Sequence, residues 1–177
     1  MRLNNLEFYN YLVEIGVTNL YHANTVATAL TYIEQRGLLS RGAVEARGLF
    51  QTAQDSDEID KVVDVWNDIF FDSLDLHGHF PRQNIYGPVS FKYSLEIVLN
   101  ENLQFWVTKN NPQYWTAETP MHDRYFQSVD ELRERGDEII VYRKMIILKN
   151  YMQAFRFTDL VNINVDNPKL FIYVSVP

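Results

Sequence analysis

The order in which helix-like and strand-like segments follow one another constrains the fold of this chain most. Segments whose apolar residues lie three or four positions apart come early, and segments that alternate apolar and polar residues come late. In Leu3–Ile15 and in Val26–Arg36 the apolar residues share one helical face. Val89–Leu99 alternates in the manner of a half-buried strand. This order predicts an α+β fold with antiparallel or mixed sheets.

Residues at the ends of these segments predict where the other elements begin and end. Gly16 ends the first helix, Thr25 is suited to cap the second, and Gly37 is expected at the carboxyl-terminal cap of the second. Ser56 is expected to cap a third helix running to about Val65. The remaining expectations are strands at Thr18–His22, Leu103–Val107, Glu138–Tyr142, Met145–Leu148, Gln153–Phe157 and Leu170–Val176, a loop with a helical turn at Ser40–Gln54, a strand or buried turn at Asp68–Asp72, and a helix at Ser128–Arg135.

Composition limits the size and the environment of the molecule. With 177 residues, 46% of them hydrophobic, residues 1–177 are expected to form a single domain with its own core. The absence of cysteine excludes disulfides and thiolate metal sites and agrees with a cytoplasmic protein. We find no secretory signal and no apolar run long enough for a bilayer, so no membrane partner is expected.

Charge and missing motifs narrow the function further. A net charge of −7 argues against non-specific coating of DNA, which requires many phosphates to be neutralised, but not against an enzyme that takes up a short single-stranded segment. The chain has no Gly-rich phosphate loop, no Gly-x-Ser-x-Gly and no His-Glu-x-x-His. P-loop hydrolases, serine hydrolases and zincins are therefore not favoured.

Three side chains are candidates for binding a sugar or a phosphate. His22, on its predicted strand, can both donate and accept a hydrogen bond, although such a position is also typical of a half-buried strand residue. The helix that follows Thr25 would offer free backbone N–H groups to a phosphate. Arg41, with Arg47 as the second choice, can grip an anion in bidentate fashion or simply face solvent.

Two groups of polar residues are expected to be structural. Asp57, Asp60 and Asp64 recur at helical spacing and are expected to face water. The other group matches no strong pattern of metal ligands, so no metal is expected. Its members are Asp72, Asp75, His77 and His79.

Two segments, taken in order, resemble the DarT family of NAD-dependent nucleic-acid ADP-ribosyltransferases. Residues 20–25 read LYHANT and precede a helix that ends in GLLS at residues 37–40. Residues 132–138 read LRERGDE and precede the apolar run IIVY and a basic pair. The resemblance covers Leu20–Ser40 and Glu131–Lys144.

The resemblance implies a fold, a cofactor and site residues. The fold would be an ADP-ribosyltransferase-like core of two small mixed or antiparallel sheets around an NAD cleft, with flanking helices. NAD would be a substrate, held by His22, and Glu138 would polarise the nicotinamide ribose at the mouth of a strand. A fixed carboxylate there stabilises the positive charge that develops on the sugar. Arg41 would be the catalytic arginine. The other residues implied to contact NAD are Asn24, Thr25, Ser40 and Arg47.

The resemblance also implies an activity and partners. ADP-ribose would pass to a base of single-stranded DNA or RNA, in a toxin neutralised by an antitoxin protein or in phage defence. The chain departs from the family at Gly136, where a polar residue is usual, and in Ser40–Asp64, which is acidic rather than basic. The modified base, and DNA or RNA as acceptor, therefore stay open. So do an ADP-ribosyltransferase acting on protein and a non-catalytic binding or immunity module. In such a module Trp106, Tyr114 and Trp115 would stack on bases or dock a partner, if they do not pack in the core.

Overall fold

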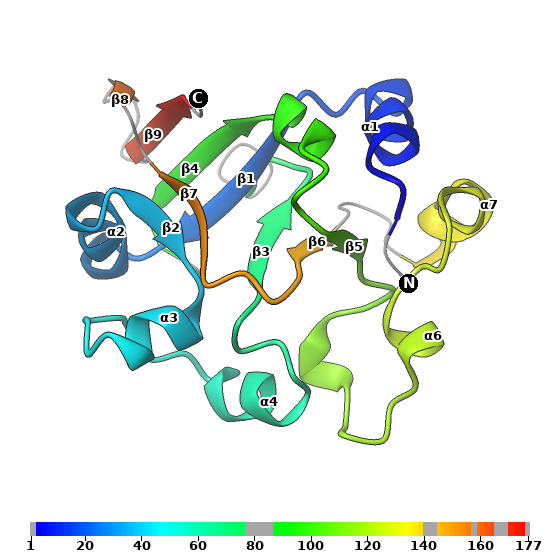
Figure 1. The fold of residues 1–177 in the computed structure, drawn as a ribbon, viewed down its shortest axis with the longest axis horizontal. Coiled ribbons are helices and arrows are strands. Elements are labelled where there is room, and N and C mark those ends of the chain that lie inside the picture. Colours follow the sequence, from blue (N-terminus) through cyan, green and yellow to red (C-terminus); the bar gives the residue numbers. More distant parts are fainter. Residues whose placement is uncertain (1–2, 77–86, 140–144, 157–158, 165–169, 176–177) are drawn as a thin grey trace.

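The structure, a computed structural model, describes the backbone of residues 3–76, 87–139, 145–156, 159–164 and 170–175, and the side chains of residues 3–76, 87–135 and 145–153. Within these ranges the chain forms six α-helices and two β-sheets (Figure 1). The predicted α+β class is therefore confirmed.

Five consecutive antiparallel strands, from the edge strand β5 (Phe105–Val107) to β4 (Val89–Ser94), form most of the larger sheet. β1 (Asn19–Asn24) lies between β3 (Ile69–Asp72) and β4. On its other side β3 pairs with β6 (Met145–Leu148), which pairs in turn with β5. β3 therefore has β1 on one side and, on the other, a strand that comes more than 70 residues later in the chain.

The described part of the chain adds two more strands to this sheet and forms a second, separate sheet. β9 (Leu170–Ser175) runs parallel to β4, and β8 (Asp159–Asn164) pairs antiparallel with β9. The second sheet joins β2 (Gly37–Leu39) to β7 (Gln153–Arg156). Of the two sheets, one has seven strands and the other only two.

The helices lie around the sheets in two groups. Figure 1 shows α2, α3 and α4 following one another along one side of the molecule, and α1, α6 and α7 on the other. The helices in the described ranges are α1 (Asn5–Glu14), α2 (Val26–Glu34), α3 (Arg41–Ala46), α4 (Asp57–Val62), α6 (Met121–Arg124) and α7 (Val129–Ile139), with two 3-10 helices, η1 (Leu95–Leu99) and η2 (Pro112–Tyr114).

Side-chain caps explain where several helices begin. The side chains of Asn4, Thr25 and Ser40 each accept a hydrogen bond from the backbone N–H three residues later. The prediction for Thr25 is confirmed. Ser56 makes no such bond, because its hydroxyl donates to the carboxylate of Asp60 instead. α4 therefore begins at the expected place without the expected cap.

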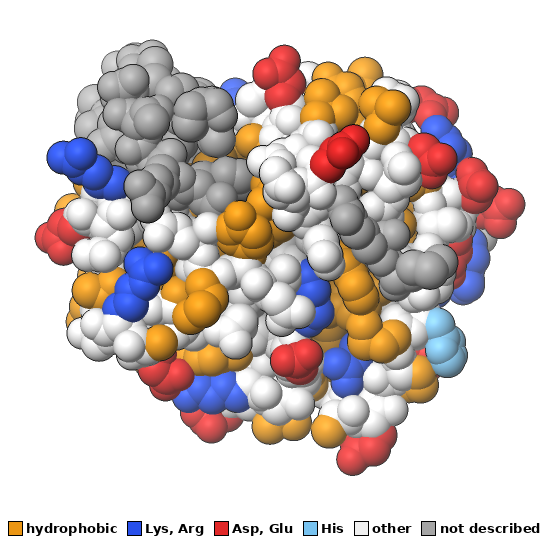
Figure 2. All heavy atoms as spheres, viewed as in Figure 1, with side chains coloured by type: hydrophobic (Ala, Val, Ile, Leu, Met, Phe, Trp, Pro, Cys, Tyr) orange, Lys and Arg blue, Asp and Glu red, His pale blue; other side chains and the backbone are white. Residues whose placement is uncertain are grey.

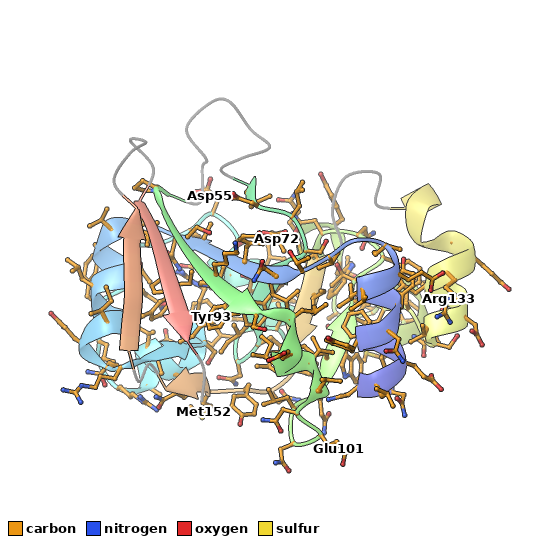
Figure 3. All side chains as sticks on the ribbon, turned by 90° about the horizontal axis from the view of Figure 1, so that it is seen from above. Asp55, Asp72, Tyr93, Glu101, Arg133 and Met152 are labelled. Carbon is orange, nitrogen blue, oxygen red and sulfur yellow. The ribbon has the colours of Figure 1, made fainter. Side chains whose placement is uncertain are left out.

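Large aromatic side chains fill the core around the central strands. Tyr32, Phe71, Phe91 and Tyr93 are almost completely buried. The rings of Phe71 and Tyr93 meet edge to face, with 5.5 Å between centroids. Figure 3 shows Tyr93 in the interior of the molecule, with Asp55 and Asp72 on one side and Glu101 and Met152 on the opposite side.

Two predictions about element ends are wrong. Gly37 does not cap α2, because Arg36 adopts the left-handed conformation (φ 51°) that ends the turn, and Gly37 already belongs to β2. The strand predicted at Val89–Leu99 stops at Ser94. The Ser94 hydroxyl accepts a hydrogen bond from the backbone N–H of Glu96 and so caps η1.

The prediction that Glu138 opens a strand is also wrong. Glu138 belongs to α7, which continues through Gly136 to Ile139. Pairs of opposite charge, Arg133 with Asp130 and Arg135 with Glu131, stabilise the part of the helix that precedes Gly136. The rest of the predicted strand, residues 140–142, lies outside the described residues, as do His77 and His79.

Candidate functional site

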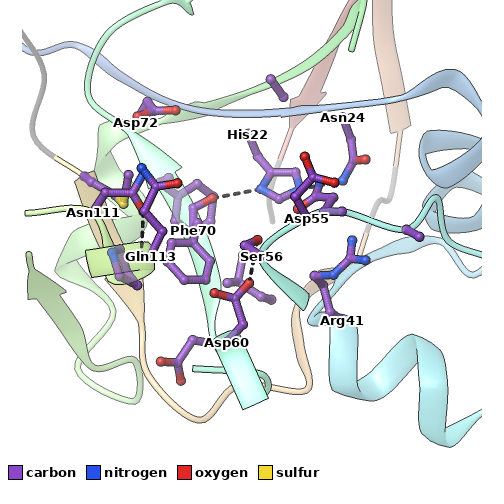
Figure 4. A pocket seen from close by; sticks show the side chains of 18 of the residues that line it. His22, Asn24, Arg41, Asp55, Ser56, Asp60, Phe70, Asp72, Asn111 and Gln113 are labelled. Atoms are coloured by element: carbon purple, nitrogen blue, oxygen red, sulfur yellow. Dashed lines mark hydrogen bonds between the residues drawn. The ribbon is translucent and has the colours of Figure 1, made fainter. Parts of the chain in front are cut away.

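A pocket of about 390 Å³ opens beside the central strands β1 and β3. Figure 4 shows His22, Asp55, Ser56, Asp60 and Arg41 around the same hollow. They come from β1, from the segment that leads into α4, from α4 itself and from α3. The residues that line the pocket are His22–Asn24, Tyr32, Arg41, Ala53–Ser56, Asp60, Asp68–Asp72, Asn111–Gln113 and Met145.

His22 is held in one tautomer by the neighbouring strand. Its Nδ1–H donates to the carbonyl oxygen of Phe70 in β3, 2.8 Å away, so Nε2 carries the lone pair. The rings of Tyr32, Phe71 and Phe91 pack around it. Burial lowers the pKa of His22 to about 4, against the hydrogen bond to Phe70, and Arg41 lowers it further. The imidazole is therefore neutral at physiological pH.

Asn24 connects the imidazole to the base of α2. Its amide nitrogen lies 3.4 Å from His22 Nε2 and donates to the hydroxyl of Tyr32 at 3.3 Å. Its amide oxygen accepts the backbone N–H of Thr25. Burial raises the pKa of the Tyr32 hydroxyl, which therefore stays protonated. His22, Asn24 and Tyr32 therefore form an uncharged side of the pocket that can both donate and accept hydrogen bonds.

Arg41 supplies positive charge to the pocket, but part of its guanidinium is already engaged. Nη2 lies 2.6 Å from the carboxylate of Asp57 and donates to the carbonyl of Thr52 at 3.1 Å. The side chain also lies over the ring of Trp66. Within the described residues Nη1 has no acceptor, and it is not among the buried nitrogens. One donor of Arg41 is therefore available to a ligand.

Carboxylates dominate the remaining charge. Asp55, Asp60, Asp68 and Asp72 all line the pocket in the described part of the chain. Asp68 is tied to Lys149 Nζ at 2.9 Å and to the backbone N–H of Asn150. Burial raises the pKa of Asp68, although Lys149 opposes that effect. The pocket is thus acidic and aromatic, with one arginine at its edge.

The structure brings together some of the residues that the sequence singled out and separates others. His22, Asn24 and Arg41 line the pocket. Thr25 and Ser40 serve as helix caps, and the Thr25 hydroxyl also contacts that of Thr52 at 2.7 Å. Arg47 is exposed at the end of α3, where it donates to the side chain of Gln153.

Glu138 is placed by its backbone alone, since its side chain lies outside the described ones. α7 packs against α1, on the side of the molecule away from α2 (Figure 1). Seven residues after Glu138, Met145 lines the pocket at the start of β6. The end of α7 is therefore connected to the pocket by a short stretch of chain.

Asp60 is one of several pocket residues, with Asp55 and Asp68, that the sequence analysis did not select as site residues. The prediction that Asp60 faces water is wrong, because its side chain is only 8% exposed and lines the pocket from α4. Asp57, expected in water as well, is paired with Arg41. The available signal was Val63, an apolar residue three positions after Asp60 and thus on the same helical face.

The two tryptophans proposed as docking groups pack internally. Trp115 is 4% exposed, and Trp106 meets Tyr125 edge to face at 4.8 Å. Tyr114, by contrast, is 71% exposed and belongs to η2, which lines the pocket through Pro112 and Gln113. Tyr114 alone of these three aromatic residues is therefore available to a partner.

No three His, Asp or Glu side chains in the described ranges are grouped in a way that could hold a metal ion. None of the helices in those ranges combines the length and the apolar character needed to span a bilayer.

Comparison with known proteins gives no relative from which to assign this site. No protein-family model, no curated protein and no solved structure matches the chain.

Proposed function

We propose that this protein is an NAD-dependent ADP-ribosyltransferase that attaches ADP-ribose to a base of single-stranded DNA or RNA. NAD occupies the pocket beside β1 and β3 as a substrate. The observation that carries the proposal is the neutral His22 on a central strand, fixed by Phe70 and sharing the pocket with Arg41. The proposal also draws on the two segments that resemble the DarT family, which contain His22 and Glu138.

The charge distribution of the pocket supports NAD as the ligand. The nicotinamide ring is a pyridinium cation, and positive charge spreads to its ribose as the glycosidic bond breaks. Aromatic faces such as Phe70 and nearby carboxylates favour a cation. Arg41, whose Nη1 has no acceptor among the described residues, is suited to the pyrophosphate. The acidic part of the pocket would thus face the nicotinamide riboside, and Arg41 would face the pyrophosphate.

In this proposal Glu138 stabilises the cationic ribose and Arg41 assists as the second catalytic residue. Met145 at the pocket edge is seven residues from Glu138, and an extended chain of that length reaches about 23 Å. Nicotinamide leaves with the bonding electron pair, and a base nitrogen bonds to the anomeric carbon. Asn24 orients the imidazole and the hydroxyl of Tyr32.

The surface supports a short nucleic-acid substrate rather than a long one. On the face seen in Figure 2, Lys and Arg side chains are interspersed with Asp and Glu. The net charge of −7 disfavours extended contact with phosphates. From the family resemblance we further propose a cytoplasmic toxin, or a phage-defence enzyme, controlled by a neutralising antitoxin protein.

The direct test is to incubate the protein with labelled NAD and single-stranded DNA or RNA, and to measure nicotinamide release and label transfer. We predict that Glu138→Ala lowers the rate by on the order of 10²–10⁴, because a preorganised stabilising group is lost. The matched control is Glu134→Ala, an exposed glutamate on the same helix, which should keep the original rate. Absence of transfer to any nucleic acid would overturn the proposal, and label on protein would support the protein-modifying alternative.

NAD binding can be tested separately from catalysis. Excess NAD should raise the melting temperature of the protein by mass action, and His22→Ala should abolish that rise. His122→Ala is the control, since this histidine is exposed on α6 and does not line the pocket. A thermal shift that survives His22→Ala would contradict the assigned role of His22.

A binding or immunity module remains the second candidate because of Tyr114. An aromatic side chain with 71% exposure beside the pocket can stack on a base or anchor a partner. Tight partner binding that Tyr114→Ala weakens, and that NAD leaves unchanged, would favour this function over the enzyme.

A further inference from the structure

The pocket contains a buried carboxylate with an unused oxygen, Asp60. The residue is 8% exposed and projects from α4 into the hollow (Figure 4). The Ser56 hydroxyl donates to Oδ2 at 3.1 Å. Within the described residues Oδ1 has no donor, and it is not among the buried oxygens. An acceptor is therefore held in place and left facing the pocket.

The other pocket carboxylates of the described chain are less suited to receive a proton. Asp68 is held on both oxygens, by Lys149 and by the backbone of Asn150. Asp55 is exposed to solvent. Asp72 lies at the end of β3, away from Ser56 and Arg41 in Figure 4. Of these four residues only Asp60 and Asp68 are buried, and Asp60 is the one of that pair with an oxygen left open to the pocket.

We propose that Asp60 is the general base of the transfer reaction and takes the hydrogen of the attacking base nitrogen as a proton. This inference rests on the function proposed above. The bond between the anomeric carbon and nicotinamide breaks, and its electron pair leaves with nicotinamide. The acceptor nitrogen bonds to the carbon, and its proton passes to Oδ1 of Asp60. Every atom and electron pair is then accounted for without another reactant.

The surroundings of Asp60 suit this role. Burial raises its pKa to about 6, whereas the Ser56 hydroxyl and Arg41 lower it. Asp57 on the same helix and Asp68 before β3 raise it further. A base with a pKa just below the working pH is largely ionised and still accepts a proton readily. The rate should therefore rise as the pH increases through about 6 and level off above it.

The test measures the pH profile of ADP-ribose transfer with saturating NAD. Asp60→Asn should lower kcat by on the order of 10²–10⁴ and remove the rise near pH 6. Ser56→Ala removes a donor that stabilises the ionised form, so the midpoint should move to higher pH. A merely structural Asp60 would not give this displacement.

Asp64→Asn is the matched control. Its side chain is exposed, it does not line the pocket, and its left-handed backbone (φ 61°) accepts asparagine readily. The NAD-induced thermal shift checks that Asp60→Asn still folds and binds. If the unmodified protein transfers ADP-ribose and Asp60→Asn keeps both its rate and its profile, this inference is wrong while the proposed function stands. If the unmodified protein transfers nothing, the proposed function fails and this inference with it.

Discussion

Two residues of the pocket have pKa values displaced in opposite directions by the same cause. Burial disfavours the charged form, so it lowers the pKa of His22 to about 4 and raises that of Asp60 to about 6. The folded protein therefore holds His22 neutral and makes the ionisation of Asp60 harder. Both effects cost stability whenever the unfolded chain would carry the charge.

These displacements predict how stability depends on pH. In the unfolded chain His22 is protonated as the pH falls below 6.5, whereas in the folded chain it is protonated only near pH 4. His22 therefore lowers the free energy of unfolding as the pH falls through this range. His22→Gln should therefore gain stability relative to the unmodified protein as the pH falls from 6.5 to 4. Each displaced pKa unit corresponds to about 1.4 kcal/mol at most. Urea unfolding at several pH values measures the difference.

Asp60 should show the opposite sign. Between pH 4 and 6 the unfolded chain loses this proton and the folded chain keeps it, so stability falls as the pH rises. Asp60→Asn should gain relative stability across that window in the same urea titrations. A constant difference from pH 4 to pH 7 would show that Asp60 titrates normally.

At the scale of elements, the turn between β6 and β7 is fastened to the start of β3. Asp68 accepts from Lys149 Nζ and from the backbone N–H of Asn150, whose own backbone is left-handed (φ 52°). The side chains of both Lys149 and Asp68 are buried. The ion pair therefore fixes the turn through which the chain passes from β6 in the larger sheet to β7 in the smaller sheet.

Asp68→Ala should destabilise the protein by about 3–5 kcal/mol, because the buried ammonium of Lys149 loses its buried counter-ion and keeps the carbonyl oxygen and the exposed carboxylate of Asp64. The comparison is Glu58→Ala, which removes an exposed partner of Lys61 and should cost less than about 1 kcal/mol. Chemical denaturation measures both. Equal losses would show that the buried pair contributes no more than an exposed one.

The elements differ in how well the sequence predicts them. α1, α2 and β1 are confirmed because their periodicity is clear and Thr25 is a strong cap. The end of α2 is mispredicted because Arg36 takes the left-handed conformation, which residues other than glycine normally avoid. No strand was predicted at the position of β8.

The site is less predictable than the fold for a physical reason. His22 and Arg41 could be selected because their local segments suggested a ligand. Asp60 could not, since its burial depends on the packing of α4 against segments distant in sequence. The helical placement of Glu138 was not predicted because Gly136 is typical of a helix end, whereas α7 continues through it to Ile139.

At the scale of the whole molecule, early segments are completed by late ones. β3 pairs with β6, β2 with β7, and β4 with β9. Each pairing closes a long loop of chain, which is entropically costly and slows folding. The pocket shares this property, because Met145 belongs to β6 and Asp68 depends on Lys149.

A fragment of residues 1–139 should therefore fail to fold. It lacks β6, so β3 and β5 lose their shared neighbour, and it lacks the β7 strand that pairs with β2. Poor dispersion in an NMR spectrum and no cooperative unfolding are expected. A native-like spectrum from this fragment would show that the early segments form the sheet without the late strands.

The pairing of β3 with β6 has a consequence for the protein during its synthesis. The pocket beside His22 cannot form until residues near 148 have left the ribosome, because β6, which contributes Met145 to its lining and pairs with β3, is not yet available. A nascent chain is therefore inert towards any ligand of that pocket. If the protein is the toxin proposed above, translation supplies a delay in which an antidote made alongside it can be ready.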